Sequence, residues 1–112
     1  MKLRLFSRGL PPGADFREFV ETRLGFALAR FAPRIHEVLV RLQDENGPKG
    51  GVDKACRVSV NLGREGMVRA EDVDPVLEAA VCRATERAGR AVARALERSG
   101  HARRRIPGET VT

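Results

Sequence analysis

The residues whose type and spacing best suit a chemical role are five arginines near the C-terminal end of the chain. They recur at intervals of three or four residues, as Arg83, Arg87, Arg90, Arg94 and Arg98. This spacing places them on one face of a helix, within an arc of roughly 80°. The acids of the same segment, Glu78, Glu86 and Glu97, fall on the far side of that helix, so the row has no acidic partner along its own length. The row therefore predicts a site for an external anion, the alternative being a solvated helix face.

Four other basic residues are weaker candidates for the same anion. Arg23 and Arg30 lie in an expected first helix, where acids such as Glu18 and Glu21 can pair with neighbouring arginines. Lys49 and Lys54 flank a glycine-rich segment that could reach phosphates. The string Gly-Pro-Lys-Gly-Gly is not by itself a phosphate-binding motif.

The remaining reactive residues do not form a catalytic or metal site. The chain has two cysteines and two histidines, Cys56, Cys82, His36 and His101, without the spacing of a zinc site. Neither histidine has a nucleophile close to it in the sequence. An acidic cluster at 71–74 is better explained by helix capping than by a metal ion. We therefore expect no enzymatic activity, no cofactor, no metal and no small-molecule substrate.

Length and charge limit the class of protein. The 112 residues suffice for one domain with one core, and the net charge of +6 suits an RNA or an acidic protein as partner. No apolar run approaches the ~20 residues that span a bilayer. We expect a cytoplasmic protein without a membrane partner.

The hydrophobic pattern predicts two helices and four strands. Period-two alternation marks strands, and apolar residues at intervals of three and four mark helices. The expected elements are a strand at 2–8, a helix from just after Gly13 to before Pro33, strands at 35–42, 56–62 and 67–70, and a helix capped by Asp72 or Asp74 with Pro75 in its first turn. The order β-α-β-β-β-α predicts an α+β fold with one four-stranded mixed sheet and two helices packed on one face, similar in shape to double-stranded RNA-binding domains. We expect a single domain over 1–99 and a basic, flexible tail over 100–112.

Aromatic residues are scarce. The chain has no Trp or Tyr and only five Phe, of which Phe6 alone lies outside the first helix. Base stacking on an aromatic sheet is therefore not expected.

Several local strings resemble the family of ribosome hibernation promoting factors and ribosome-associated inhibitors, in its short form. The segment 16–24, Phe-Arg-Glu-Phe-Val-Glu-Thr-Arg-Leu, is similar to the family's Leu-Arg-Glu-Tyr-Val-Glu-Lys-Arg-Leu. Segments 46–54 and 79–81 also resemble family strings, and Arg87, Arg90 and Arg94 fall on the family's basic helix positions. Glu78 stands where the family usually has Tyr. Gly89 stands where the family has Glu, which costs about 1 kcal/mol in helix propensity.

The resemblance implies a function that spacing alone does not give. It implies a translation-inhibiting stress-response factor that binds 16S rRNA in the decoding channel of the small ribosomal subunit. The long form's dimerisation domain is missing from the sequence, so we expect no ribosome pairing through a domain of this chain. Two alternatives stay open, a general structured-RNA-binding module and a protein-interaction regulator of the same fold, both acting away from ribosomes.

Overall fold

Strands and helices follow one another in the order that the hydrophobic pattern predicts. The computed structural model describes residues 1–8, 13–44 and 54–111, with side chains as far as Arg98. The elements are β1 (Lys2–Arg8), α1 (Ala14–Leu28), the 3-10 helix η1 (Ala29–Arg34), β2 (Glu37–Asp44), β3 (Lys54–Asn61), the 3-10 turn η3 (Gly63–Glu65), β4 (Met67–Asp74) and α2 (Leu77–Val111). The predicted order β-α-β-β-β-α is confirmed.

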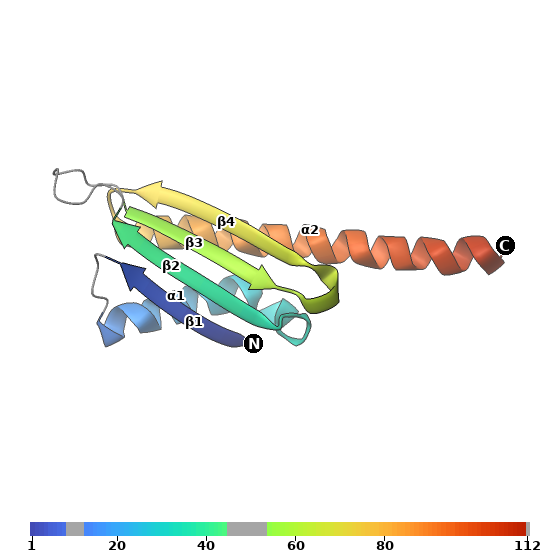
Figure 1. Cartoon of the computed structure of the whole chain (residues 1–112), viewed down its shortest axis with the longest axis horizontal. Coiled ribbons are helices and arrows are strands. Elements are labelled where there is room, and N and C mark those ends of the chain that lie inside the picture. The colour runs from blue at the N-terminus through green and yellow to red at the C-terminus, as the bar shows by residue number, and fades with distance from the viewer. Residues whose placement is uncertain (9–12, 45–53, 112) are drawn as a thin grey trace.

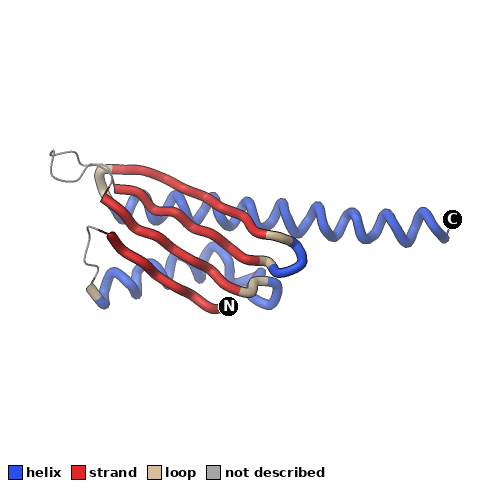
Figure 2. Tube along the Cα trace, viewed as in Figure 1, coloured by secondary structure: helices blue, strands red, loops and turns tan. Residues whose placement is uncertain are grey.

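The four strands form one mixed sheet in the order β1-β2-β3-β4. β1 pairs with β2 in parallel, whereas β2 with β3 and β3 with β4 are antiparallel. Both helices lie on the same face of this sheet (Figure 1). In Figure 2, no described helix or strand lies over the opposite face of the sheet. The molecule thus has a helical layer and an open sheet face.

The core lies between the sheet and the two helices. Every second side chain of β2 and β3 is fully buried there, and they meet the apolar stripes of α1 and α2. The central residues are Val20, Leu24, Leu28, Val38, Val40, Leu42, Cys56, Val58, Val60, Val81, Ala84, Ala88 and Val92. Burial also raises the pKa of the Cys56 thiol to about 12, which keeps it protonated.

Some boundaries differ from those expected. α1 ends at Leu28 and the chain continues as the short 3-10 helix η1, which contains Pro33. Proline has no N–H to continue an α-helical hydrogen-bond ladder, which agrees with the end of α1 before it. β4 reaches Asp74 and not residue 70, so Pro75 lies before α2 and not in its first turn. Asp74 does accept a hydrogen bond from the Val76 N–H at 2.8 Å, next to the start of α2.

The largest difference concerns the segment after residue 99. The sequence predicts a tail without regular structure, but the backbone of α2 continues as a helix to Val111. Ala102 and the arginines at 103–105 favour a helix, and extending a helix that has already formed costs little, whereas Gly100, Pro107 and Gly108 disfavour one. α2 consequently projects well past the end of the sheet (Figure 1).

Gly89 marks the close approach of α1 and α2. A Cβ atom at this position would lie 2.9 Å from the carbonyl oxygen of Ala27 and 3.3 Å from its Cβ. Any larger residue would push the two helices apart. Gly89 lowers helix propensity, but its lack of a side chain allows α1 and α2 to pack closely.

Candidate nucleic-acid interface

The first arginine of the α2 row is held by two acids of β4. Arg83 Nε donates to Asp72 Oδ2 at 2.8 Å, and Arg83 Nη2 donates to Asp74 Oδ2. The hydrogen bond from Arg83 lowers the pKa of Asp74 below its ordinary 3.8, and the same bond raises the pKa of Arg83. The prediction concerned acids of the same helix, and the partners of Arg83 come instead from the neighbouring strand.

Arg87 is held in the same way. Its Nη1 atom donates to the carbonyl oxygen of Glu71 at 2.8 Å and lies 3.1 Å from Asp72 Oδ1. Asp72 is only 9% exposed and faces the helical layer, so one nearly buried carboxylate holds two arginines. The acidic cluster at 71–74 thus does more than cap α2.

The second part of the row has no such partners. Arg90, Arg94 and Arg98 are exposed. Within the part of the chain that the structure describes, none of the three forms a salt bridge. The β4 acids that hold Arg83 and Arg87 lie at the C-terminal end of that strand, close to the start of α2. These three guanidiniums keep their full capacity for an external anion.

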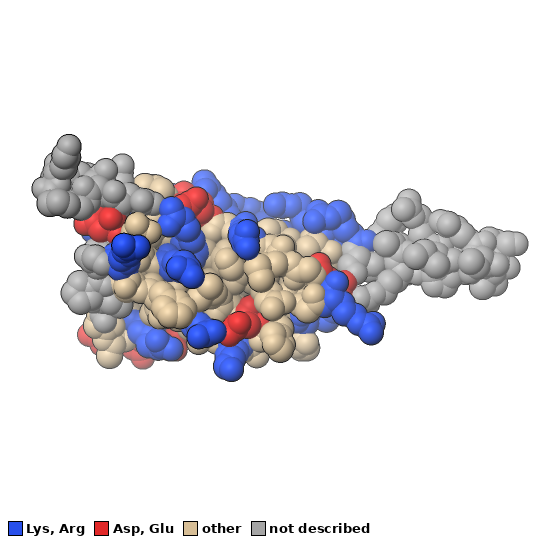
Figure 3. All heavy atoms as spheres, viewed as in Figure 1, with Lys and Arg blue, Asp and Glu red and all other residues tan. Residues whose placement is uncertain are grey.

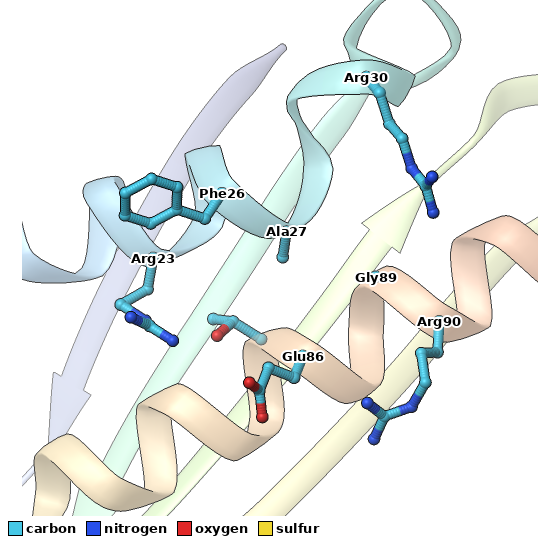
Figure 4. Close-up of a pocket in the computed structure, with 8 residues that line it drawn as sticks. Arg23, Phe26, Ala27, Arg30, Glu86, Gly89 and Arg90 are labelled. Carbon is cyan, nitrogen blue, oxygen red and sulfur yellow. The ribbon is translucent and has the colours of Figure 1, made fainter.

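Arg90 also lines a cleft between α1 and α2 (Figure 4). The cleft has a volume of about 270 Å³ and is lined by the residues Arg23, Phe26, Ala27, Arg30, Thr85, Glu86, Gly89 and Arg90. Three of these residues are basic and only Glu86 is acidic. The close contact of Gly89 with Ala27 forms its floor, because it lets α1 and α2 approach without a side chain between them.

The two arginines from α1 and η1 differ in their surroundings. Arg23 points across the cleft toward α2 in Figure 4, and its Nε atom is buried without a hydrogen-bond partner among the described residues. Arg30 is exposed, with its guanidinium carbon 4.6 Å from the ring centre of Phe31. A buried donor without a partner is costly, and an anion oxygen in the cleft would satisfy it.

The lysines contribute less to this site. Lys54 begins β3, away from the cleft, and its Nζ atom lies 3.9 Å from Asp44 Oδ2. Lys49 falls at 45–53, outside the described residues. The structure therefore brings together Arg23, Arg30 and Arg90, and it does not place Lys54 with them.

Two residues of this site were not predicted to shape it. Asp72 faces inward because β4 stays extended through Asp74, which a predicted strand of four residues does not indicate. Gly89 could have been recognised from the sequence, because it interrupts a strong helical pattern. A glycine at such a position often allows a close contact with a neighbouring element.

Among the described residues, no group of three or more His, Cys, Asp or Glu side chains could hold a metal ion. The helices of the described part include none that is long and apolar enough to cross a membrane.

Comparison with known proteins gives the family. The profile described as Sigma 54 modulation protein / S30EA ribosomal protein matches residues 3–99. This chain belongs to that family. Its members are ribosome-associated factors of the hibernation type and not enzymes, so the family resemblance and the expected absence of enzymatic activity are confirmed.

Solved structures agree with the family assignment. The N-terminal domain of Protein Y from Thermus thermophilus superposes with a TM-score of 0.69 at 27% sequence identity, over 84% of this chain and 98% of that domain. A ribosomal subunit interface protein from Coxiella burnetii gives the same TM-score of 0.69 at 13% identity, over 84% of this chain and 96% of its own. The second similarity supports the family's fold alone. No curated protein sequence gives a significant match.

Proposed function

We propose that this protein silences ribosomes in the cytoplasm by binding 16S rRNA of the small subunit through its helical layer. The observation that carries this proposal is the arginine-rimmed cleft between α1 and α2, continued by Arg94 and Arg98 along α2. Family membership supplies the ribosome as partner. The proposed contact residues are Arg23, Arg30, Arg90, Arg94 and Arg98, with Arg83, Arg87 and Lys54 in lesser roles because acids already hold them.

The chemistry of this layer suits a folded RNA backbone. Phosphate oxygens accept the planar fork of guanidinium donors, and release of condensed counterions makes the binding favourable at low salt. Arg23 Nε gains the hydrogen bond that it lacks within the described part of the protein. Shape, more than base identity, selects such a target, because folded RNA presents mainly phosphates and 2′-hydroxyls.

The proposed consequence is inhibition of initiation. A factor seated in the decoding channel excludes messenger RNA and tRNA from the same space, so it needs affinity and shape but no catalysis. We propose that this occupancy serves translation regulation under stress, as the family assignment suggests.

Binding to purified small subunits at several salt concentrations tests the proposal. The Arg90→Ala and Arg94→Ala variants should each weaken binding and lower the slope of log affinity against log salt by about one unit or less. Arg87→Ala should have a smaller effect, because Asp72 and the Glu71 carbonyl already hold that side chain. Arg17→Ala is the charge-matched control, since Arg17 pairs with Glu21 on α1 at 3.5 Å.

Two results would contradict the proposal. In a density gradient of cell lysate, the protein would remain at the top, separate from small subunits and whole ribosomes. In the binding experiment, random duplex RNA would bind as tightly as small subunits, which would favour a general structured-RNA-binding module.

A further inference from the structure

The open face of the sheet carries a regular grid of side chains. Strand register aligns its outward residues in four rows that each cross β1, β2, β3 and β4. In that strand order, the rows are Arg8-Gln43-Ala55-Val73, Phe6-Arg41-Arg57-Glu71, Arg4-Leu39-Ser59-Arg69 and Lys2-Glu37-Asn61-Met67. The strands are spaced by about 4.8 Å, so each row extends about 14 Å across the sheet.

This grid is cationic. It holds the basic residues Lys2, Arg4, Arg8, Arg41, Arg57 and Arg69 and the acids Glu37 and Glu71. Each acid already has a basic partner, since Arg4 pairs with Glu37 at 3.8 Å and Arg57 with Glu71 at 2.6 Å. Figure 3 shows the basic side chains spread over this face.

Two arginines of the central rows are available to a ligand. Arg41 and Arg69 are exposed, and neither forms a salt bridge within the described part of the chain. Arg41 lies directly across from Arg57 in the β2–β3 register, so two like charges are adjacent on the open face. Glu71 already neutralises Arg57 at 2.6 Å, so Arg41 is the member of this pair that has no salt bridge within the described part of the chain.

Phe6 provides a stacking surface beside these charges. Its ring is 46% exposed, and the guanidinium carbons of Arg4 and Arg41 each lie 5.7 Å from the ring centre. An exposed aromatic ring flanked by guanidiniums is the arrangement on which unpaired bases stack while their phosphates meet the cations.

A shallow depression lies next to this ring. Its floor includes Leu39 and Ser59, short or apolar side chains at the centre of the grid. Arg41, Arg57 and Arg69 stand around it together with one acid, Glu71, which pairs with Arg57. Its volume is about 520 Å³, larger than that of the cleft between the helices. The partly apolar floor suits a base, and the arginines at the rim suit the backbone phosphates on either side of that base.

We propose that the open sheet face binds a segment of single-stranded RNA, with one base stacked on Phe6 and phosphates held by Arg41 and Arg69. Charge complementarity identifies a polyanion, and the exposed ring selects one with unpaired bases over a duplex or an acidic peptide. The sheet face is opposite to the helical layer, so this site does not depend on the ribosome assignment. The chain would then hold two RNA segments on its two faces.

Fluorescence anisotropy with a labelled 12-nucleotide oligouridine and the full chain tests this site without ribosomes. Phe6→Leu keeps an apolar side chain but removes the ring, and it should weaken binding by about 5- to 100-fold. Arg41→Ala and Arg69→Ala should also weaken binding and should lower its salt dependence.

The matched control lies on the helical layer. Arg17→Ala removes an exposed arginine of α1 that lines neither the cleft nor the sheet face. This variant should bind the oligouridine as the unmodified protein does. Thermal unfolding of every variant checks the fold, and photocrosslinking of the oligouridine to the unmodified protein should label peptides of β1 and β2.

Two outcomes would overturn the sheet-face proposal. Binding would be unchanged in Phe6→Leu, Arg41→Ala and Arg69→Ala, or a 12-base-pair duplex or a polyglutamate peptide would bind as tightly and with no dependence on Phe6. Loss of oligouridine binding in the sheet variants together with unchanged binding to small subunits would separate this site from the proposed ribosome contact.

Discussion

The two parts of the arginine row on α2 are alike in sequence and different in structure. Arg83 and Arg87 are held by β4 through Asp72, Asp74 and the Glu71 carbonyl, whereas Arg90, Arg94 and Arg98 have no salt bridge within the described residues. The first pair joins the helix to the edge of the sheet. The difference shows that a helical wheel identifies which cations share a face but not which of them are neutralised by another element.

The largest test of this difference is charge reversal in the second part. The double variant Arg90→Glu and Arg94→Glu should lower affinity for small subunits by about 100-fold or more, because two attractive phosphate contacts become repulsive. Equilibrium binding at fixed salt measures it. Since neither side chain forms a salt bridge within the described part of the chain, the midpoint of urea unfolding should change little. An equally large loss of affinity in Arg83→Ala would show that the two parts of the row are equivalent.

Freeing Arg83 and Arg87 from Asp72 should lower the stability of the protein and raise its affinity for small subunits. Asp72→Asn removes the negative charge that holds Arg83 and Arg87 but keeps the size of the side chain. Loss of charge-assisted hydrogen bonds at a nearly buried position should lower the free energy of unfolding by about 1–3 kcal/mol. The two released arginines should raise affinity for small subunits and steepen the salt dependence. Lower affinity together with lower stability would show that these arginines need their β4 partners to act.

Gly89 separates the two parts, and its lack of a side chain holds α1 against α2. Gly89→Ala should lower the free energy of unfolding by about 1–2 kcal/mol, because overpacking against Ala27 outweighs the gain in helix propensity. Gly25→Ala in α1 is the matched control, since a Cβ there meets nothing within 4 Å. The control should stabilise the protein by about 1 kcal/mol or less. Urea unfolding of the two variants should therefore shift the midpoint in opposite directions.

The smallest expected effect is a pH dependence confined to the first part of the row. The folded protein lowers the pKa of Asp74 below 3.8, chiefly through the hydrogen bond from Arg83. The stabilisation is thus fully present above pH 3.8 and is lost as the pH falls through the lower folded value. The stability difference between the unmodified protein and Asp74→Asn should shrink over that acidic range. A difference that stays constant from pH 5 to pH 2 would contradict the pairing with Arg83.

The fold was predictable from the sequence because each element carries its own period. The alternation of Val58 and Val60 with Arg57 and Ser59 is visible without knowing the neighbouring strands, and it correctly gave β3. The pairing of Arg83 was not predictable in this way. It depends on β4 staying extended as far as Asp74, which the apolar residues of that strand, ending at Ala70, do not signal.

The site shows the same limit for single residues. The small number of aromatic residues argued against base stacking on the sheet, but composition does not say where a ring lies. Register places Phe6 on the open face between two arginines, and one exposed ring is enough for one base. Gly89 is a similar case, because its helix propensity is local and its contact with Ala27 is not.

The position of β1 has a consequence for the order in which the molecule folds. β1 lies at an edge and pairs only in parallel with β2, from which it is separated by all of α1 and η1. Closing that long connection costs more chain entropy than closing the turn between β3 and β4, so β1 should join last and exchange its amide protons first. Phe6 and Arg4 sit on this strand, and an RNA bound to them would slow that exchange. β1, the strand whose amide protons exchange fastest, would thus be the strand that a bound RNA protects most.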